Sequence, residues 1–541
     1  VPSSEVHHER PHPEECTCHP QSGIRRREFV AGSLATGAVA FSGTPLWGQV
    51  GPTVPQHCVP PQPLGDPVQF TPSTTGPVRV RKSAFELNAT EVTRLKSAYT
   101  ALRNLAQQKP DDPRSWFHQG QVHCWYCSGA LDGLWGQEIH GSWWFLPWHR
   151  AYLYFHEQIL GALIGDPTFA LPYWDWDTPG RDRFPFDAYG QPNDMSNPLY
   201  DQSRAVGPND RIPAGFVGPK MMKGVLGAAT FTDFGGSGDQ SLGQNQMGAL
   251  EGGPHGGVHV WTTDPKVDFN NPKPDMGVLA SAAYDPVFFA HHANIDRVWD
   301  KWIKDDPAKH ANPSNTAWLQ QFFFFYDQTP NWTYISNNQM LEPEALRYRY
   351  QPPQTTTPSP AVVAAAPAAR AAVRLAQVPQ LSAPVVELSQ GAEPKTLTPD
   401  PVTVRATFPS QGRERLMAVP SAAPAASGAQ QKVILRIEGV EIPANHGALI
   451  NVFLNQPNAT AATGIDDPGY VGTIAVVANQ GPGAVHAHPV VRNFGFDITD
   501  KVAALGNDNN LAVTLVPATG AGEKPAGVNV KYSRVYIATR Q

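Results

Sequence analysis

Apolar positions recur with the spacing of an α-helix in several segments of the first 350 residues. The periodicity predicts helices over 87–108 and, most strongly, over 144–163, whose sequence is WFLPWHRAYLYFHEQILGAL. Asn88 or Thr90 can serve as the N-cap of the first of them. The segments HGGVHVW and DPVFFAHHANIDRVWDKWI predict two further helices. Four helices that turn histidines inward are typical of a metal site in the core of a helix bundle.

The pattern changes near residue 351. Residues 351–430 are rich in Ala, Pro, Ser and Thr and poor in aromatic residues, which predicts a linker. From Lys432 onward the apolar residues alternate with polar ones, in VILRIEG, ALINVFLN, GTIAVVA, NFGFDI, LAVTLVP and VNVKYSRVYIA. Such short strands predict an antiparallel β-sandwich over 431–541. The predicted fold is therefore a mainly α domain over 50–350, the linker, and an all-β C-terminal domain.

Composition narrows the classes of function. The chain has 541 residues, 41% of them hydrophobic, which is enough for more than one domain with a sizeable core. Its formal net charge of −6 argues against binding to nucleic acid. No apolar run is long enough to span a bilayer. The composition is typical of a soluble globular protein.

A paired arginine, Arg26-Arg27, precedes the modest apolar stretch AGSLATGAVAFSG, in which Ala38-Val39-Ala40 could be a cleavage site. This arrangement is typical of twin-arginine export, so the sequence predicts a leader over 1–49 and a periplasmic or secreted protein. The alternative is a disordered basic tail. Export would place the protein in an oxidising compartment, where disulfides persist.

Six histidines fall into two sets of three, which are His123, His140 and His149, and then His255, His259 and His292. In HGGVH the two histidines are four residues apart and therefore share one helix face. Three imidazoles per site, with no carboxylate or thiolate clearly completing either set, suit copper better than calcium, magnesium or structural zinc. A zinc protease would have Glu directly after the first His, where this chain has Gly256.

Other histidines and the cysteines leave alternatives open. His118 and His156 are expected to be structural, and only one of the adjacent His291 and His292 should point at a metal, because neighbours on a helix diverge by about 100°. Without the leader three cysteines remain, namely Cys58, Cys124 and Cys127. One disulfide and one other bond would account for them, although a CxxC pair can also be redox-active or bind zinc.

The segments HCWYC, HGSWWFLPWHRAYLYFHE and DPVFFAHHANID resemble the copper signatures of the tyrosinase and polyphenol oxidase (catechol oxidase) family, whose members hold a type 3 dicopper centre. The resemblance is greatest to plant polyphenol oxidases and covers nearly all of 55–350. VILRIEGVEI, INVFLN, AVHAH and LAVTLVP are similar to the shielding domain of that family.

The resemblance implies a role for each motif residue. The first copper would be held by His123, His140 and His149, and the second by His255, His259 and His292. Cys127 matches the cysteine that forms a thioether to the second histidine of the first site, here His140, and Cys58 with Cys124 matches a disulfide. Glu251 matches a glutamate that holds a water near the coppers, although an acidic residue at a helix N-terminus is also favoured by the macrodipole.

Two positions depart from the family pattern. The residue after His255 is often Asn in members that hydroxylate monophenols, whereas here it is Gly256. A bulky Phe stands over the copper pair in many plant members and aligns with Leu279. The first difference argues against strong monophenol hydroxylation, and the second predicts a more open entrance for substrate.

The resemblance implies a latent enzyme that uses two copper ions and O₂ to oxidise small phenolic substrates, namely catechols, to o-quinones, while O₂ ends as water. A protease that cuts the linker could activate it by releasing the C-terminal domain. The alternatives are a tyrosinase with substantial monophenol hydroxylase activity, a hemocyanin-like oxygen-binding protein and, more distantly, a zinc hydrolase. The sequence carries no signal for an oligomeric state.

Overall fold

The computed structural model describes residues 58, 65–127, 138–238, 245–354, 375–376, 386–387, 389, 395–418, 432–480, 489–505 and 510–540. These residues belong to one compact unit, Leu46–Gln541. The predicted leader over 1–49 lies outside the described residues, as does much of the predicted linker. Within the described ranges, no helix is both long enough and apolar enough to cross a membrane.

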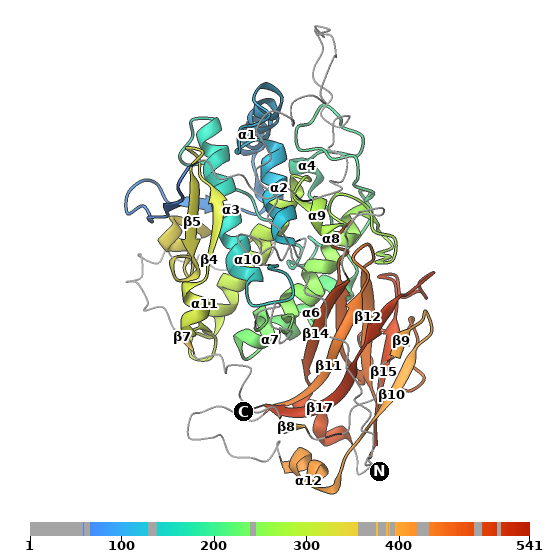
Figure 1. Ribbon diagram of the computed structural model, residues 1–541. Coiled ribbons are helices and arrows are strands. Elements are labelled where there is room, and N and C mark those ends of the chain that lie inside the picture. The colour runs from blue at the N-terminus through green and yellow to red at the C-terminus, as the bar shows by residue number, and fades with distance from the viewer. Residues whose placement is uncertain are drawn as a thin grey trace, which may run out of the picture. The chain divides into compact units, whose positions relative to one another are not determined.

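Five helices build the first part of the molecule, and each overlaps a predicted helix or carries a histidine of interest. They are α1 (Ala89–Gln108), α2 (Trp116–Cys127), α3 (Phe145–Leu163), α8 (Gly256–Thr263) and α10 (Val287–Asp305). At the start of α1 the side chain of Asn88 accepts the N–H of Glu91, whose carboxylate in turn accepts the N–H of Asn88. Helix α3 packs against both α1 and α10 (Figure 1).

Short elements fill the space around these helices. The helical ones are η2 (Ala84–Glu86), α4 (Phe186–Tyr189), α5 (Ala214–Val217), α6 (Pro219–Leu226), α7 (Phe231–Gly235), the π-helical turn η4 (Glu251–His255), α9 (Leu279–Ala282), α11 (Thr316–Gln320), η5 (Asn337–Gln339) and η6 (Pro343–Leu346). The strands are β1 (Val68–Gln69), β2 (Arg79–Arg81), β3 (Asn312–Pro313), β4 (Phe322–Tyr326), β5 (Trp332–Ser336) and β6 (Tyr348–Tyr350). The Gly- and Pro-rich stretch after α3 is thus interrupted by short helices.

Buried ion pairs join α3 to α10 and to strand β2. Asp296 of α10 accepts a hydrogen bond from Arg150 of α3 at 2.5 Å, and Glu157 of α3 accepts hydrogen bonds from Arg79 at 2.6 Å and Arg81 at 2.8 Å. All of these side chains are buried. Because a buried charge without a partner is costly, the pairs restrict how the two helices can shift.

Two antiparallel sheets form the C-terminal β domain, defined here as β8 to β17. One sheet has the order β10 (Val402–Thr407), β15 (Asn510–Pro517), β12 (Ala448–Leu454) and β13 (Tyr470–Val476). The other has the order β8 (Val386–Glu387), β17 (Arg534–Arg540), β11 (Lys432–Ile442), β16 (Val530–Tyr532) and β9 (Lys395–Leu397), with β14 (Val490–Asp497) also paired to β11. Alternate residues such as Val433, Leu435 and Ile437 are buried in a separate apolar core, as the period of two predicts.

The sheets also include residues from the segment predicted as a linker. Strands β9 and β10 pair with β16 and β15, and they are followed by helix α12 (Ser410–Ala418). The sequence VTVRAT in β10 alternates like a strand, although the surrounding Pro and Ala residues obscured this in the composition. The remaining elements are β7 (Leu375–Ala376), which pairs with β3, and η8 (Thr499–Leu505).

The C-terminal β domain contacts the elements that carry the histidines. Strand β13 packs against η4 and α8, and the chain just after β13 continues along α9. There the N–H of Leu279 donates to the carbonyl of Ala478 at 2.9 Å, and the N–H of Ala280 donates to the carbonyl of Asn479 at 3.0 Å. An ion pair between Lys432 and Asp233, at 3.2 Å, adds to this contact.

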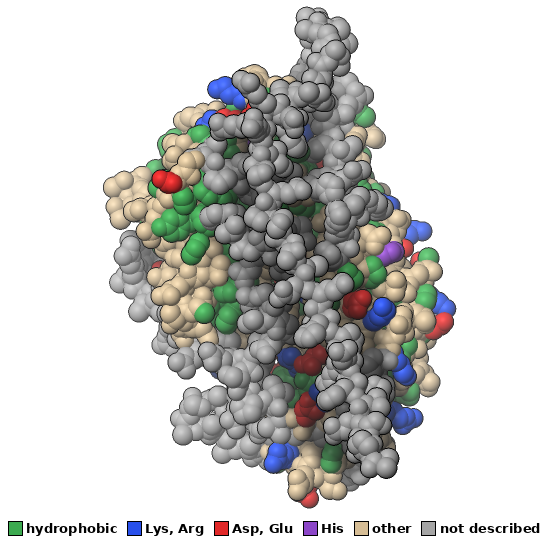
Figure 2. All heavy atoms as spheres, viewed as in Figure 1, with side chains coloured by type: hydrophobic (Ala, Val, Ile, Leu, Met, Phe, Trp, Pro, Cys, Tyr) green, Lys and Arg blue, Asp and Glu red, His purple; other side chains and the backbone are tan. Residues whose placement is uncertain are grey.

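Charged side chains of both signs are interspersed on the face drawn in Figure 2. The described residues on that face show no broad patch of Lys and Arg.

Candidate metal centre

Seven histidines gather in two groups in the interior. The first histidine group is His123, His140 and His149, and the second is His255, His259, His291 and His292. Each residue offers one ring nitrogen, and within a group these nitrogens lie within 4.8 Å of one another. All seven side chains are at most 2% exposed.

Local structure explains how each histidine reaches its group. Helix α2 carries His123, α3 carries His149 and α10 carries His292, whereas His140 lies in the segment before α3. His255 ends η4 and His259 follows one turn later in α8, so their ring centres are 4.5 Å apart. The groups adjoin each other, since the ring centres of His140 and His255 are 5.8 Å apart.

Hydrogen bonds fix the orientation of three rings. Nδ1 of His123, His149 and His259 lies 2.9, 2.8 and 2.8 Å from the backbone carbonyl oxygens of Leu279, Phe145 and Met276 respectively. Each Nδ1–H therefore donates to a carbonyl, which leaves the lone pair on Nε2. A ring held in this way is in the form that binds a metal ion.

The Nε2 atoms have the surroundings expected for metal ligands. Among the described residues, Nε2 of His140, His149 and His255 has no hydrogen-bond partner, although each atom is buried. Nε2 of His259 faces Nε2 of His292 at 3.2 Å. Buried polar atoms without partners are rare, and a cation bound between them would satisfy all of these nitrogens.

Burial lowers the pKa of every histidine in both groups, to about 3 in the case of His259. Neighbouring imidazoles add to the effect at several of them. The rings are therefore neutral at physiological pH. Only the neutral imidazole has a lone pair to give to a metal.

His291 differs from its neighbour. The indole N–H of Trp176 donates to Nδ1 of His291 at 3.1 Å. A neutral ring whose Nδ1 accepts a hydrogen bond carries its proton on Nε2. The lone pair of His291 is thus already used, while Nε2 of His292 faces His259.

Two of the described histidines outside the groups, His156 and His118, were expected to be structural. Nε2 of His156 lies 3.3 Å from the hydroxyl of Tyr99 and its Nδ1 lies 3.2 Å from Oε1 of Gln119, and the ring stacks on Phe289. Nε2 of His118 lies 3.1 Å from the carbonyl oxygen of Pro110. Both histidines have structural partners, as the sequence predicted.

A buried carboxylate, Glu251, lies at the edge of the two groups. Its Oε1 accepts the backbone N–H of Gly141 at 2.7 Å, and its Oε2 has no hydrogen-bond partner among the described residues. Burial raises the pKa of Glu251 to about 8. A carboxyl group with such a pKa can take up or release a proton near neutral pH.

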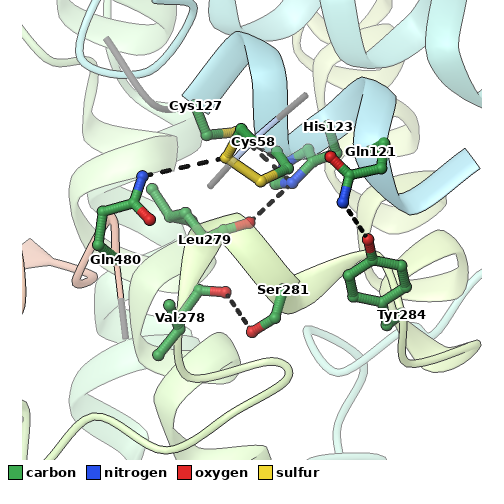
Figure 3. The surroundings of a disulfide bond; sticks show 10 residues. Cys58, Gln121, His123, Cys127, Val278, Leu279, Ser281, Tyr284 and Gln480 are labelled. Atoms are coloured by element: carbon green, nitrogen blue, oxygen red, sulfur yellow. Dashed lines mark hydrogen bonds between the residues drawn. A yellow bond between two sulfur atoms is a disulfide. The ribbon is translucent and has the colours of Figure 1, made fainter. Parts of the chain in front are cut away.

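The disulfide implied by the resemblance is present between Cys58 and Cys124. Figure 3 shows it close to His123 and Leu279, with Gln480 of the C-terminal β domain reaching the sulfur of Cys58 at 4.0 Å. Cys127 is buried and not in a disulfide, and its sulfur lies 3.3 Å from Nε2 of His123. The thioether between Cys127 and His140 stays a prediction.

The C-terminal β domain closes the space in front of the histidines. The cavity that remains has a volume of about 10 Å³ and is lined by His140, Glu251, His255, Leu279 and Met247 together with Ala475, Val476, Val477, Asn479 and Arg492 of that domain. This is about the room that one water molecule needs. A phenol ring does not fit, so Leu279 does not provide an open entrance while the domain is in place.

Three polar residues at this closure were not identified from the sequence, namely Glu138, Asn479 and Arg492. Glu138 stands two residues before His140, a position that carried no recognisable motif. Arg492 is a charged residue at a buried position of the alternating strand β14, and a charge facing inward from a sheet could have marked it. Asn479 follows β13 in a stretch without any such signal.

Comparison with known protein families matches three parts of the chain. Residues 113–224 and 202–305 match the common central domain of tyrosinase. Residues 312–358 match the polyphenol oxidase middle domain, and residues 415–532 match the chloroplastic polyphenol oxidase C-terminal domain. The first two families match the helical part of the chain, and the third matches the C-terminal β domain.

Individual proteins give the same result. The chain is 30% identical to polyphenol oxidase B, chloroplastic, of Solanum lycopersicum over 528 residues, which cover 90% of this chain and 82% of that protein. It is 38% identical to the latent form of chloroplastic polyphenol oxidase from Prunus armeniaca over 310 residues, which cover 52% of this chain but only half of that protein. A solved structure of latent aurone synthase (polyphenol oxidase) superimposes with a TM-score of 0.65 at 25% identity, covering 88% of this chain and 92% of the other.

The helical core with two histidine groups and a covering β domain thus has the fold of the latent polyphenol oxidases. This chain belongs to the polyphenol oxidase family, the plant-type branch of the tyrosinase copper oxidoreductases. The hemocyanin-like carrier is not favoured by these relatives, and neither is a tyrosinase with strong monophenol hydroxylation.

The predicted twin-arginine export to the periplasm or the medium is wrong. The relatives from Prunus, Malus and Solanum are all named as chloroplastic proteins. The prediction was based on an arginine pair before a stretch of small residues. Organelle-targeting sequences are also rich in Arg and Ser and poor in acidic residues, so the pair does not determine the destination.

Proposed function

We propose that this chain oxidises o-diphenols to o-quinones with O₂ as the oxidant. In the balanced reaction two catechols and one O₂ give two o-quinones and two waters. The observation that carries the proposal is the pair of adjoining histidine groups. Their rings are buried and neutral, the ring nitrogens of each group lie within 4.8 Å of one another, and Nε2 of His140, His149 and His255 has no hydrogen-bond partner in the described part of the chain.

The donor set fits two copper ions. One would be held by His123, His140 and His149, and the other by His255, His259 and His292. Neutral imidazoles without a thiolate or carboxylate in the groups suit copper. When bound, the copper pair would supply the two-electron exchange between catechol and O₂. His291 would stay outside the coordination sphere, because its lone pair accepts the N–H of Trp176.

Aromatic side chains keep the imidazoles in place and exclude water. The ring centre of Phe145 lies 4.7 Å from His255 and 4.8 Å from His149. The ring centre of Phe288 lies 4.7 Å from His123 and 4.2 Å from His292. Each phenylalanine therefore contacts histidines of both groups, and both side chains are fully buried.

Glu251 is the proposed proton acceptor for the substrate hydroxyl. Gly141 anchors its Oε1, while Oε2 is free to take a proton. Gly256 has no side chain and therefore no side-chain amide to hold a water beside this carboxylate. In our proposal the site therefore deprotonates the relatively acidic hydroxyls of a catechol more readily than the hydroxyl of a monophenol. Leu279 would border the entrance once the C-terminal β domain has left.

We further propose that the enzyme is latent and that a protease activates it by cutting between residues 376 and 386. Strand β7 before this stretch pairs with β3 of the helical part, whereas β8 after it pairs with β17 of the C-terminal β domain. A cut there would separate the two parts without removing a strand from either. The closed cavity of about 10 Å³ supports the need for such a release.

The test combines metal analysis with a choice of substrates. The purified chain should hold two copper ions, and the reduced protein should gain a near-ultraviolet absorption band on exposure to oxygen. After proteolytic cutting it should oxidise catechol and 3,4-dihydroxyphenylalanine much faster than tyrosine. A chain that holds zinc, or that binds oxygen without oxidising catechol after the cut, would contradict the proposal. Equal activity in the full chain and in a chain ending at residue 350 would contradict latency.

A further inference from the structure

His140 differs from the other oriented histidines in the partner of its Nδ1. His123, His149 and His259 each donate to a backbone carbonyl, whereas Nδ1 of His140 lies 3.3 Å from Oε1 of Glu138. The same oxygen accepts the backbone N–H of His140 at 2.9 Å. One carboxylate thus holds both the ring and the backbone of this histidine.

The position of His140 explains why it needs such a partner. His123, His149 and His259 lie within helices, whose backbone fixes the direction of each side chain. His140 lies in the non-helical segment before α3. Its ring therefore needs a side-chain contact for its direction, and Glu138 supplies one from two residues away, beside the thioether to Cys127 that the family resemblance implies.

The other oxygen of Glu138 faces the C-terminal β domain. Its Oε2 accepts a hydrogen bond from the amide of Asn479 at 3.3 Å and lies 3.9 Å from Nη2 of Arg492. Glu138, Asn479 and Arg492 are 5%, 6% and 2% exposed. Gly141 allows this approach, because a Cβ at that position would lie 2.3 Å from Cδ of Arg492. The buried carboxylate is thus shared between a histidine of the first group and the covering domain.

We propose that Glu138 is a positioning residue for the first copper site, and that Asn479 and Arg492 hold it against His140. The proposal rests on the function proposed above, because it assigns His140 as a ligand. A carboxylate that accepts Nδ1–H fixes the tautomer and leaves the lone pair on Nε2. Nε2 of His140 is the atom without a hydrogen-bond partner. Asn479 and Arg492 belong to the C-terminal β domain. Removal of that domain therefore also removes two of the groups that hold Glu138 against His140.

Two substitutions of Glu138 distinguish a residue that positions His140 from one that merely fills space. Glu138→Gln keeps an oxygen that can accept Nδ1–H, whereas Glu138→Ala removes it. Loss of a hydrogen-bond partner behind a metal-binding histidine typically weakens metal binding by about 10- to 100-fold. We expect Glu138→Ala to weaken copper binding at one of the two sites by this factor, and Glu138→Gln to stay within about tenfold of the wild type.

The measurement is copper content per chain during dialysis of the full holoenzyme against a chelator, together with the absorption band that appears on oxygenation. Glu138→Ala should approach one copper per chain while the wild type retains two, and its band should weaken. Two coppers held as tightly as in the wild type, with an unchanged band, would overturn the proposal. If Glu138→Ala does not fold, Glu138→Asp serves instead. It keeps the charge but shortens the reach to His140, and it should also release one copper selectively.

A double substitution tests the part played by the C-terminal β domain. Asn479→Ala should shift copper release in the same direction as Glu138→Ala, but less, and should have no further effect when Glu138 is already Ala. Asn451→Ala is the matched control, since Asn451 accepts a hydrogen bond from Thr473 of the neighbouring strand instead. Additive effects of Asn479→Ala and Glu138→Ala would overturn this coupling. A wild-type chain without copper would contradict the proposed function itself, whereas two coppers in both wild type and Glu138→Ala would contradict only this inference.

Discussion

The ring of His149 stacks on the ring of His292, with 4.1 Å between their centres and an angle of 11° between their planes. The two residues come from different histidine groups and from the packed helices α3 and α10. The buried pairing of Arg150 with Asp296 joins the same two helices one and four residues further along the chain. The spacing between the two groups is therefore set by helix packing and not by a loop.

This geometry predicts different results for two adjacent histidines. His292→Ala should remove one copper per chain and abolish catechol oxidation, because Nε2 of His292 faces His259. His291→Ala should retain two coppers. It should lower the free energy of unfolding by about 1–3 kcal/mol, because the buried N–H of Trp176 loses its acceptor. Copper analysis and thermal unfolding of both variants distinguish a metal ligand from a structural histidine. Loss of copper in His291→Ala alone would make His291, and not His292, the ligand.

The sequence predicted the parts of the site that follow local rules. The spacing of HGGVH places His255 and His259 one turn apart, and helical periodicity located α3 and α10. The alternating pattern likewise predicted the buried faces of β11. Such rules do not predict the contacts between the helical part and the C-terminal β domain that close the site. Glu138 and Arg492 are 354 residues apart (492 − 138) and meet only through the seating of one domain on the other. No local pattern reports that kind of contact.

The raised pKa of Glu251 predicts how the stability of the copper-free protein depends on pH. The pKa of its carboxyl is about 8 in the folded chain, against 4.5 for an ordinary glutamate. The folded state therefore binds more protons than the unfolded state between these values, so this group lowers stability as pH rises from 4.5 to 8. The slope reaches at most about 1.4 kcal/mol per pH unit.

Glu251→Gln provides the comparison, because it cannot titrate. The free energy of unfolding of the wild type, minus that of Glu251→Gln, should fall between pH 5 and pH 8 and become constant above it. Denaturant unfolding at several pH values, with the metal removed from both proteins, gives this difference. A difference that does not change over this range would show that the carboxyl titrates normally.

The disulfide between Cys58 and Cys124 should contribute substantially to stability. It joins residues separated by 66 positions in the chain, and closing a loop of that size stabilises a protein by about 4 kcal/mol. We expect Cys58→Ser to lose stability of this order, measured by denaturant unfolding. Reductant should destabilise the wild type to a similar extent and leave Cys58→Ser unaffected. If thiol titration shows the bond to be reduced while the unfolding midpoint stays the same, the prediction is wrong.

Gly256 should control how firmly the C-terminal β domain closes the site. A Cβ at this position would lie 2.8 Å from the backbone carbonyl oxygen of Ala475 in β13, and a backbone atom cannot turn aside as a side chain can. Gly256→Ala should therefore weaken the closed arrangement by about 1–3 kcal/mol, although Ala favours the helix itself. The activity of the uncut chain, divided by that of the same variant after proteolytic cutting, should rise above the wild-type ratio. Gly224→Ala in α6 is the matched control, because a Cβ there meets nothing within 4 Å, and its ratio should equal that of the wild type. An unchanged ratio in Gly256→Ala would show that β13 can shift to admit a methyl group while the site remains closed.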